Sequence, residues 1–269
     1  MRNPLPRCAA LALALALALA MSCVHAASTR LLFFGEQHDQ PDQQRQVAAE
    51  VQALATRGEL AAVVLEMAEQ PHRTTAVARD ASEAAVREAL RWRGWPWEPY
   101  APLVMNAVRA GVPVLGGNLP RAEMRAAMAD ASLDALVDAA GRTALGEAVR
   151  VGHCELLPAA QLPGMVRIQI ARDRALAHAV AEAWRSAPAG STVLLLAGAQ
   201  HVSRDRGVPQ HLQRALVTAP PLHVVLFSAE GDGLLVDERR SAVFTPQEDH
   251  CEALRKRLAA PKPGSAPGP

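Results

Sequence analysis

Charged and polar side chains that could do chemistry follow four short apolar segments of this sequence. The first segment runs into a Gly-x-x-His element containing Glu36 and His38, and the fourth into a second such element containing His201. Glu66 follows the second segment and Asn118 the third. A neutral imidazole supplies a ligand nitrogen or a general base, while a carboxylate supplies charge for a cation or orients an imidazole. The combination of imidazoles and carboxylates predicts a metal site or a site that polarises a substrate.

An α/β fold is the arrangement that would position these side chains. Apolar runs typical of buried strands recur at residues 31–34, 61–65, 112–115, 192–197 and 222–227. Segments with apolar residues at helical spacing separate them, at residues 41–57, 76–91, 102–109, 121–139 and 168–186. This alternation predicts a mainly parallel central sheet with helices on both faces.

The ends of parallel strands bring the polar side chains to one edge of the sheet, where open α/β folds bind ligands. We therefore expect Glu36, His38, Glu66, Asn118 and His201 to surround one cavity. Three of them also have a purely structural interpretation: Glu36 as a helix cap, Glu66 as an arginine partner and Asn118 as a turn-stabilising amide. Four strand ends of this kind together favour a site.

Other candidates are weaker. Arg172 and Asp173 lie near the start of a helix and either support the site or form a surface ion pair. His153 and Cys154 are a candidate ligand pair for a soft metal. The tryptophan-rich stretch at residues 92–102 is either a surface insertion or a packing plug. Fingerprints of serine hydrolases, P-loops and dinucleotide-binding folds do not occur in the sequence.

Length and composition indicate one domain. The chain has 269 residues, half of them apolar, and a formal net charge of +1. Such a chain can bury one substantial core and has no electrostatic bias toward nucleic acid. We expect the domain to span residues 27–258, followed by a disordered tail rich in proline and glycine at residues 259–269.

The first 26 residues have the features of a signal peptide, with two arginines before an Ala/Leu run at residues 9–20. The run is too short for a transmembrane helix. Ordinary cleavage after Ala26 would release a periplasmic protein. Cleavage before Cys23, which ends a lipobox-like sequence, would leave a lipid-anchored envelope protein. Either route predicts export, and the mature chain is expected to have no membrane span.

Both routes leave Cys154 and Cys251 as the ordinary cysteines of the mature chain. An even pair in an oxidising compartment predicts one disulfide, and two separate thiols are the alternative. A disulfide would compete with a ligand role for Cys154.

At these same residues the chain resembles the ChaN-like haem-binding uptake proteins of the Tiki superfamily, relatives of TraB and erythromycin esterase-like proteins. The matching sequence motifs, which occur in the same order as in the family, are LLFFGEQHDQPDQQ, VVLEMAEQ, VPVLGGNLPR, GHCELLP, QIARDRALA and LLLAGAQHVSRDRGVP. The resemblance implies a metal or catalytic role for Glu36, His38, Glu66 and His201, with Asn118, Arg172 and Asp173 in support. The chain departs from the family pattern at Gln43 and Gln44, because the family often has a histidine shortly after the first motif.

Two functions follow from the resemblance. The first is a cell-envelope protein that binds haem and acts in haem-iron uptake, with an outer-membrane haem receptor and a second copy of the chain as partners. Tyrosine is the associated haem ligand, and Tyr100 is the single tyrosine here, so we expect it on an apolar surface that covers the porphyrin. The alternative is a hydrolase of peptide or ester bonds that uses a divalent metal ion. We favour haem binding, and the sequence leaves open whether the protein is an enzyme.

Overall fold

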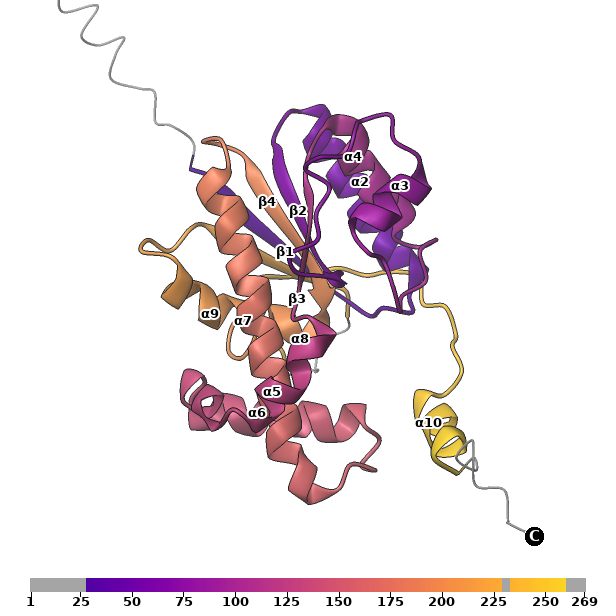
Figure 1. Cartoon of the computed structure of the whole chain (residues 1–269), viewed down its shortest axis with the longest axis vertical. Coiled ribbons are helices and arrows are strands. Elements are labelled where there is room, and N and C mark those ends of the chain that lie inside the picture. The colour runs from indigo at the N-terminus through magenta and orange to yellow at the C-terminus, as the bar shows by residue number, and fades with distance from the viewer. Residues whose placement is uncertain (1–27, 229–232, 260–269) are drawn as a thin grey trace, which may run out of the picture.

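A computed structural model describes residues 28–228 and 233–259 of the chain. Within this part the strands form one six-stranded sheet in the order β3-β2-β4-β1-β5-β6, and every neighbouring pair is parallel. The strands are β1 (Arg30–Glu36), β2 (Leu60–Glu69), β3 (Val114–Asn118), β4 (Thr192–Gly198), β5 (Leu222–Leu226) and β6 (Glu238–Arg239). Figure 1 shows this sheet at the centre of the molecule. The α/β fold with a parallel sheet is confirmed.

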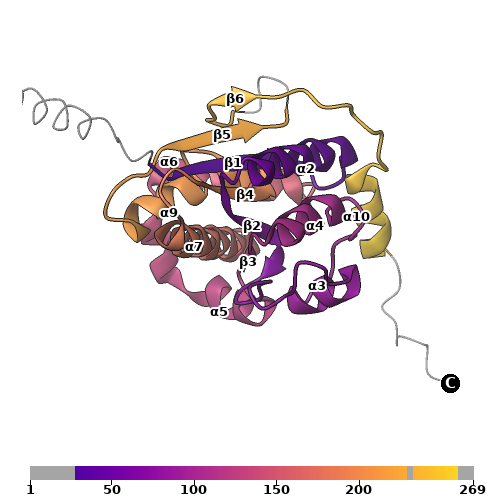
Figure 2. The same cartoon turned by 90° about the horizontal axis from the view of Figure 1, so that it is seen from above.

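Helices cover both faces of the sheet because side chains alternate along each buried strand. Phe34 packs in a core with α2 (Pro41–Thr56), α3 (Glu83–Ala89) and α4 (Ala101–Ala110). Leu31 and Phe33 point the other way, toward α7 (Leu162–Ser186) and α9 (Val208–Ala215). Figure 2 shows α2 and α4 on one side of the sheet and α7 and α9 on the other.

A third, smaller core lies beyond the carboxyl edge of the sheet. Here α5 (Met124–Ala129) and α6 (Ala139–Gly152) pack on the first half of α7, around Leu133, Leu145 and Ile170. Short 3-10 turns join these helices at Arg121–Glu123, Ala131–Leu136 and Ala159–Gln161. Figure 1 shows this layer below the sheet. Because it lies beyond the strand ends, it forms a wall facing the predicted site.

Several predicted helices differ from the observed ones. The helix expected at residues 76–91 begins only at Glu83, because the side chain of Ser82 accepts the backbone N–H of Ala85 and caps it there. The helix expected at residues 121–139 is broken at Asp130, whose backbone is extended and whose carboxylate accepts the N–H of Ser132. Helices α6 and α9 were not predicted, whereas a last helix was expected at Cys251 and is α10 (His250–Ala259).

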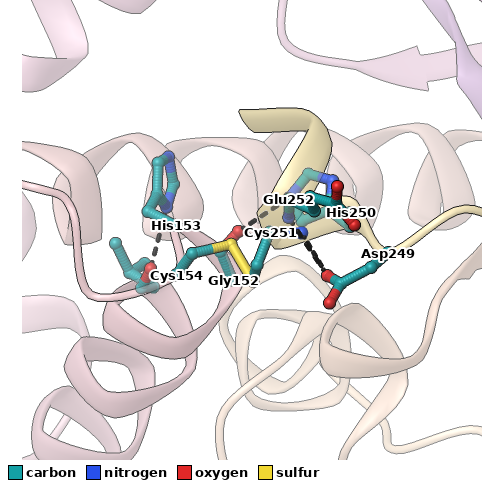
Figure 3. Close-up of a disulfide and its surroundings, with 8 residues drawn as sticks. Gly152, His153, Cys154, Asp249, His250, Cys251 and Glu252 are labelled. Atoms are coloured by element: carbon teal, nitrogen blue, oxygen red, sulfur yellow. Dashed lines mark hydrogen bonds between the residues drawn. A yellow bond between two sulfur atoms is a disulfide. The ribbon is translucent and has the colours of Figure 1, made fainter. Parts of the chain in front are cut away.

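The expected disulfide is present. Cys154 follows α6 and Cys251 lies in α10, their sulfurs are bonded, and their Cα atoms are 5.4 Å apart. Figure 3 shows the bridge between these two segments. The alternative of two separate thiols is therefore wrong.

Two predictions concern residues that the structure does not describe. The signal peptide with Cys23 and the tail from residue 260 onward lie outside the described residues. No helix among residues 28–228 and 233–259 is long and apolar enough to cross a membrane.

Candidate functional site

Parallel strands bring the predicted polar residues together. Glu36 ends β1, Glu66 lies in the second half of β2, and Asn118 ends β3. Gly198 ends β4 in register with Glu36 and leads into the short helix α8 (Ala199–Val202), which carries His201. All these groups lie at the same edge of the sheet.

A cavity of about 590 Å³ opens at this edge. Its lining includes Glu36, His38, Glu66 and His201, so the prediction of one shared cavity is confirmed for these four residues. Asn118 lies behind them and supports the floor through hydrogen bonds, rather than lining the cavity.

Two glycines allow the close approach of the Gly-x-x-His elements. A Cβ atom on Gly198 would lie 3.0 Å from Nε2 of His38, so glycine leaves room for that imidazole. A Cβ atom on Gly35 would lie 2.5 Å from Cγ2 of Val202, so glycine lets α8 pack on β1. The repeated element therefore holds two imidazoles over adjacent strand ends.

The two imidazoles lie on either side of the Glu66 carboxylate. His38 places Nε2 3.7 Å from Oε2 of Glu66, and His201 places Nε2 3.5 Å from Oε1. The other ring nitrogens are also occupied, since Nδ1 of His38 lies 2.9 Å from Oε1 of Glu36 and Nδ1 of His201 lies 2.6 Å from Oδ1 of Asp173. The result is a chain of alternating carboxylates and imidazoles.

Further hydrogen bonds occupy the Glu66 carboxylate. Oε2 accepts the backbone N–H of Gly198 at 2.6 Å, and Oε1 forms an ion pair with Arg172. Arg172 in turn donates Nε–H to Asn118 Oδ1 at 3.0 Å, and the amide of Asn118 donates to the backbone carbonyl of Glu66 at 2.9 Å. The structure thus brings Asn118, Arg172 and Asp173 to the site, as predicted. It also agrees with the interpretation of Glu66 as an arginine partner.

The charges of this chain shift the pKa values of its members. Burial alone would lower the pKa of His201, but the carboxylates of Glu66 and Asp173 outweigh it and raise that pKa to about 9. Burial also opposes the rise at His38, whose pKa is raised by the hydrogen bond to Glu36 and the charge of Glu66. Burial would raise the pKa of Glu66, yet His201, Arg172 and His38 hold it well below its usual range. At neutral pH His201 is therefore an imidazolium beside an ionised glutamate.

This arrangement does not favour a bound metal ion. Among residues 28–228 and 233–259, no group of three or more His, Cys, Asp or Glu side chains is arranged to hold one. The carboxylates of Asp173 and Glu66 face the two ring nitrogens of His201, and the Glu66 oxygens already accept hydrogen bonds from Gly198 and Arg172. The four residues predicted as metal ligands form an ion network in this structure.

Tyr100 lies beneath this network. Its hydroxyl donates to Oε1 of Glu36 at 2.7 Å and lies 3.5 Å from Nδ1 of His38. Gln44 donates to the other oxygen of Glu36. Burial and the negative charge of Glu36 raise the pKa of Tyr100, so its phenol stays protonated.

The expectation that Tyr100 lies on an apolar surface is wrong. Its side chain is fully buried, because Trp92 packs 5.6 Å from it and Trp97 packs edge-on against Trp92 at 5.0 Å. Of the two interpretations of this tryptophan-rich stretch, the packing plug is correct for Trp92 and Trp97. Trp95 differs, since it lines the cavity with its ring 4.4 Å from that of His38.

The wall opposite the network was largely missed from the sequence. It consists of Leu145, Val149 and His153 from α6 and its end, and of His250 from the start of α10. The available signal was the position of each histidine, since His153 directly precedes Cys154 and His250 directly precedes Cys251. The sequence indicates no role for His250, and for His153 only a pairing with Cys154 as soft metal ligands. The disulfide excludes that pairing.

Comparison with solved structures places this architecture among known folds. The structure described as "Cofacial heme binding to ChaN of Campylobacter jejuni" superposes with a TM-score of 0.63 at 24% sequence identity, covering 77% of this chain and 84% of that one. A second match, the type III effector HopBA1, has a TM-score of 0.47 at 13% identity and covers 79% of this chain and 88% of that one. Among curated proteins none matches the chain.

The family described as "Haem-binding uptake, Tiki superfamily, ChaN" matches residues 23–212. This range covers most of the chain and includes both Gly-x-x-His elements, Glu66, Asn118 and the first half of the disulfide. The resemblance inferred from the sequence words is confirmed, and the chain belongs to the ChaN family of haem-binding uptake proteins in the Tiki superfamily.

Proposed function

We propose that this protein binds haem in the cavity at the carboxyl edge of its sheet and acts in haem-iron uptake at the cell envelope. The observation that carries the proposal is the mixed lining of this cavity in a chain of a haem-binding family. Trp95, Leu145 and Val149 give the cavity an apolar wall. Four imidazoles also line it: those of His38 and His201 at the strand ends, which form the cavity floor, and those of His153 and His250 at the opposite rim. Cofactor pockets are mostly apolar concavities of about 300–1,000 Å³ with a few polar groups, and this cavity has that character.

The lining fits an iron porphyrin chemically. A porphyrin needs apolar contact for its faces and an axial ligand for its iron, which imidazole can provide. Haem also carries two carboxylates, and the cationic side chain of Arg172 lines the same cavity. Bound haem would supply an iron centre, while the residues of this chain bind it, orient it and limit its contact with water.

Tyr100 stays a predicted haem ligand, but its surroundings oppose that role. Ligation through the phenolate would require the phenol to lose its proton, and burial together with Glu36 raises its pKa. The hydroxyl would also have to leave its hydrogen bond to Glu36. We therefore assign Tyr100 first to holding Glu36 and His38 in place.

The location in the envelope is part of the proposal. A disulfide between Cys154 and Cys251 is typical of proteins that fold in an oxidising compartment. Export by the predicted signal peptide, a lipid anchor on Cys23, an outer-membrane haem receptor and self-association are consistent with this location. Nucleic acid is not an expected partner, since the net charge is +1.

Metal-dependent hydrolysis is not favoured. A general base works best with a pKa near the operating pH, whereas the pKa of Glu66 is held well below its usual range and that of His201 is raised to about 9. Neither group is free to accept a proton near neutral pH. We therefore assign Glu66 and His201 to the structure of this end of the cavity, where Glu36 and His38 belong to the same hydrogen-bonded network.

Hemin titration of the purified protein, followed by its Soret absorption, tests the proposal. We expect a saturable spectral change. Ala148 lines the cavity from α6, and Ala148→Trp should fill that space and weaken hemin binding. Ala144, one helical turn earlier and outside the cavity lining, is the matched control, and Ala144→Trp should bind hemin as the unmodified protein does.

Two outcomes would overturn the proposal. The first is the absence of a saturable change in protein shown to be folded by circular dichroism. The second is equal hemin affinity for Ala148→Trp and Ala144→Trp, which would place hemin outside this cavity. The role of Tyr100 is tested alongside them. Tyr100→Phe should keep the wild-type hemin spectrum if the phenol only orients Glu36, and should lose it if Tyr100 ligates the iron.

A further inference from the structure

We propose that His153 and His250 form an imidazole pair at the rim of the cavity that supplies nitrogen ligands to haem iron, and that the Cys154–Cys251 disulfide assembles this pair. The inference rests on the proposed haem-binding function. It adds the identity of the ligands and a redox condition for the complete site.

His153 is prepared for ligation by its contact with the backbone. Its Nδ1 lies 2.8 Å from the carbonyl oxygen of Val149, one turn earlier in α6. A carbonyl can only accept, so Nδ1 carries the proton and Nε2 keeps its lone pair. Within the described part of the chain Nε2 makes no hydrogen bond, and the half-buried ring lines the cavity. Iron-ligating histidines are commonly oriented by such a contact through the second ring nitrogen.

His250 reaches the same rim from the other end of the chain. Its Nε2 lies 3.2 Å from the carbonyl oxygen of Gly152, so Nε2 carries the proton and Nδ1 keeps its lone pair. His250 lines the cavity although 97 residues separate it from His153 in the sequence, the same separation as between the bridged cysteines. It lies beyond residue 212, outside the region that matches the family.

The disulfide holds these two imidazoles together. It joins the residue directly after His153 to the residue directly after His250, and Figure 3 shows the two rings on either side of the bridge. No residue of α10 is buried, and the carboxylate of Asp249 caps the helix through the N–H groups of Cys251 and Glu252. Because α10 has so little packing of its own, the covalent bridge fixes the position of His250.

The floor histidines are less suited to the same role. Both ring nitrogens of His201 face carboxylates, Asp173 beside Nδ1 and Glu66 near Nε2, so both are already occupied. His38 has Glu36 beside Nδ1 and Glu66 near Nε2. Among the histidines that line the cavity, the rim pair therefore offers the free nitrogens.

Binding through the rim pair needs no redox chemistry at the iron. Nε2 of His153 and Nδ1 of His250 would hold the iron through their lone pairs, and each ring would keep the proton on its other nitrogen. Reduction of the disulfide by an external dithiol would convert Cys154 and Cys251 to thiols and oxidise the dithiol. α10 would then be released and would carry His250 away, leaving His153 in place.

The experiment compares hemin affinity and visible spectra of folded full-length variants. His153→Ala and His250→Ala should each bind hemin roughly 10-fold or more weakly and change the spectrum, since even groups outside the immediate ligands affect metal affinity by this much. His178→Ala is the matched control, because His178 is exposed on α7 and does not line the cavity. It should behave as the unmodified protein. His250→Gln tests whether the imidazole itself matters, and it should behave as His250→Ala.

The double substitution C154S/C251S tests the role of the bridge without a reductant that would also reduce iron. It should match His250→Ala in affinity and spectrum, and adding His250→Ala to it should change nothing further. Wild-type affinity and spectrum in both His153→Ala and His250→Ala would overturn the ligand assignment while leaving haem binding intact. A full effect of His250→Ala in the C154S/C251S background would overturn the role of the bridge. Absence of hemin binding to the unmodified protein would instead defeat the proposed function.

Discussion

Nδ1 of His201 lies 2.6 Å from Oδ1 of Asp173, and both side chains are buried where they line the cavity. This contact fixes the ring so that Nε2 faces Glu66 at 3.5 Å. An imidazole between two carboxylates is stabilised in its protonated form, and removing either partner would leave a buried charge without compensation. The geometry of the Gly-x-x-His element thus builds an ion network that holds the strand ends together.

The first prediction concerns stability at alkaline pH. The pKa of His201 is about 9 in the folded protein and near its ordinary value of 6.5 when unfolded, so its contribution is fully present below pH 6.5. The free energy of unfolding should fall as pH rises from about 6.5 to 9, by on the order of 3 kcal/mol for the His201 network as a whole. The raised pKa of His38 acts in the same direction.

Urea denaturation between pH 6 and pH 10 measures this dependence. His201→Gln should be less stable at pH 6 and should lose most of the alkaline slope. A slope that survives unchanged in His201→Gln would contradict the assignment of the alkaline loss to this residue.

The second prediction concerns stability at acid pH and involves His211 in α9. This side chain is buried, and among the described residues its Nε2 has no hydrogen-bond partner. Burial and the charges of Arg174 and Arg214 lower its pKa to about 4. As the pH falls, His211 becomes protonated near pH 6.5 in the unfolded chain but only near pH 4 in the folded chain. The free energy of unfolding therefore decreases as the pH falls from about 6.5 to 4.

His211→Leu replaces the titrating imidazole with an apolar side chain at this buried position of α9. The stability of this variant relative to the unmodified protein should increase from pH 7 to pH 4.5, by on the order of 2 kcal/mol. Comparing the two proteins removes the effect of the carboxylates, which titrate in both. An equal stability difference at both pH values would show that His211 does not titrate in this window.

Strand positions and the convergence of the site could be predicted from sequence because they depend on local pattern and one topological rule. Apolar runs mark β1, β2 and β4, and parallel strands bring Glu36, Glu66 and His201 to one edge whatever the details of packing. Arg172 and Asp173 were expected near the site, but which group each residue would pair with could not be predicted. Arg172 reaches Glu66 from a residue 106 positions away, and Tyr100 reaches Glu36 from 64 positions away.

The burial of Tyr100 and the rim of the cavity were beyond sequence reasoning for a related reason. A tyrosine among tryptophans is compatible with an exposed aromatic surface as well as with a packed core. Here Trp92 packs against Tyr100 and Trp97 packs against Trp92, and Tyr100 is buried. His250 lies in a helix with no buried residue, so no apolar pattern indicates where it docks. A disulfide sets its position, and sequence alone cannot show that two cysteines approach each other.

The third prediction concerns Gly207, which lets the chain after α8 pass close to its own backbone. A Cβ atom there would lie 2.2 Å from the carbonyl oxygen of His201, and a backbone atom cannot move aside as a flexible side chain can. Gly207→Ala should therefore displace α8 and destabilise the protein by about 1–3 kcal/mol, the range for overpacked sites.

Gly146→Ala is the matched control. Gly146 lies within α6, where a Cβ atom would meet only Val166 at 4.0 Å, and alanine favours the helix more than glycine does. This variant should be as stable as the unmodified protein or more so, as measured by thermal unfolding. If Gly207→Ala and Gly146→Ala unfold at the same temperature, the close approach at Gly207 has no energetic consequence.

The last prediction concerns what the disulfide does for stability, apart from haem. The bridge joins residues 97 positions apart, and closing a loop of that size stabilises by about 4–5 kcal/mol in the chain-entropy model. The three hydrophobic cores do not include any residue of α10, so the domain should remain folded without the bridge. C154S/C251S should unfold at a lower temperature, yet keep its far-ultraviolet spectrum apart from the contribution of one short helix. Hydrogen exchange measured by mass spectrometry should show α10 losing its protection first, while the amides of β1 and β4, which pair with each other in the centre of the sheet, keep theirs. Protection of α10 equal to that in the bridged protein would mean that contacts other than the disulfide hold this helix, and that His250 reaches the cavity without it.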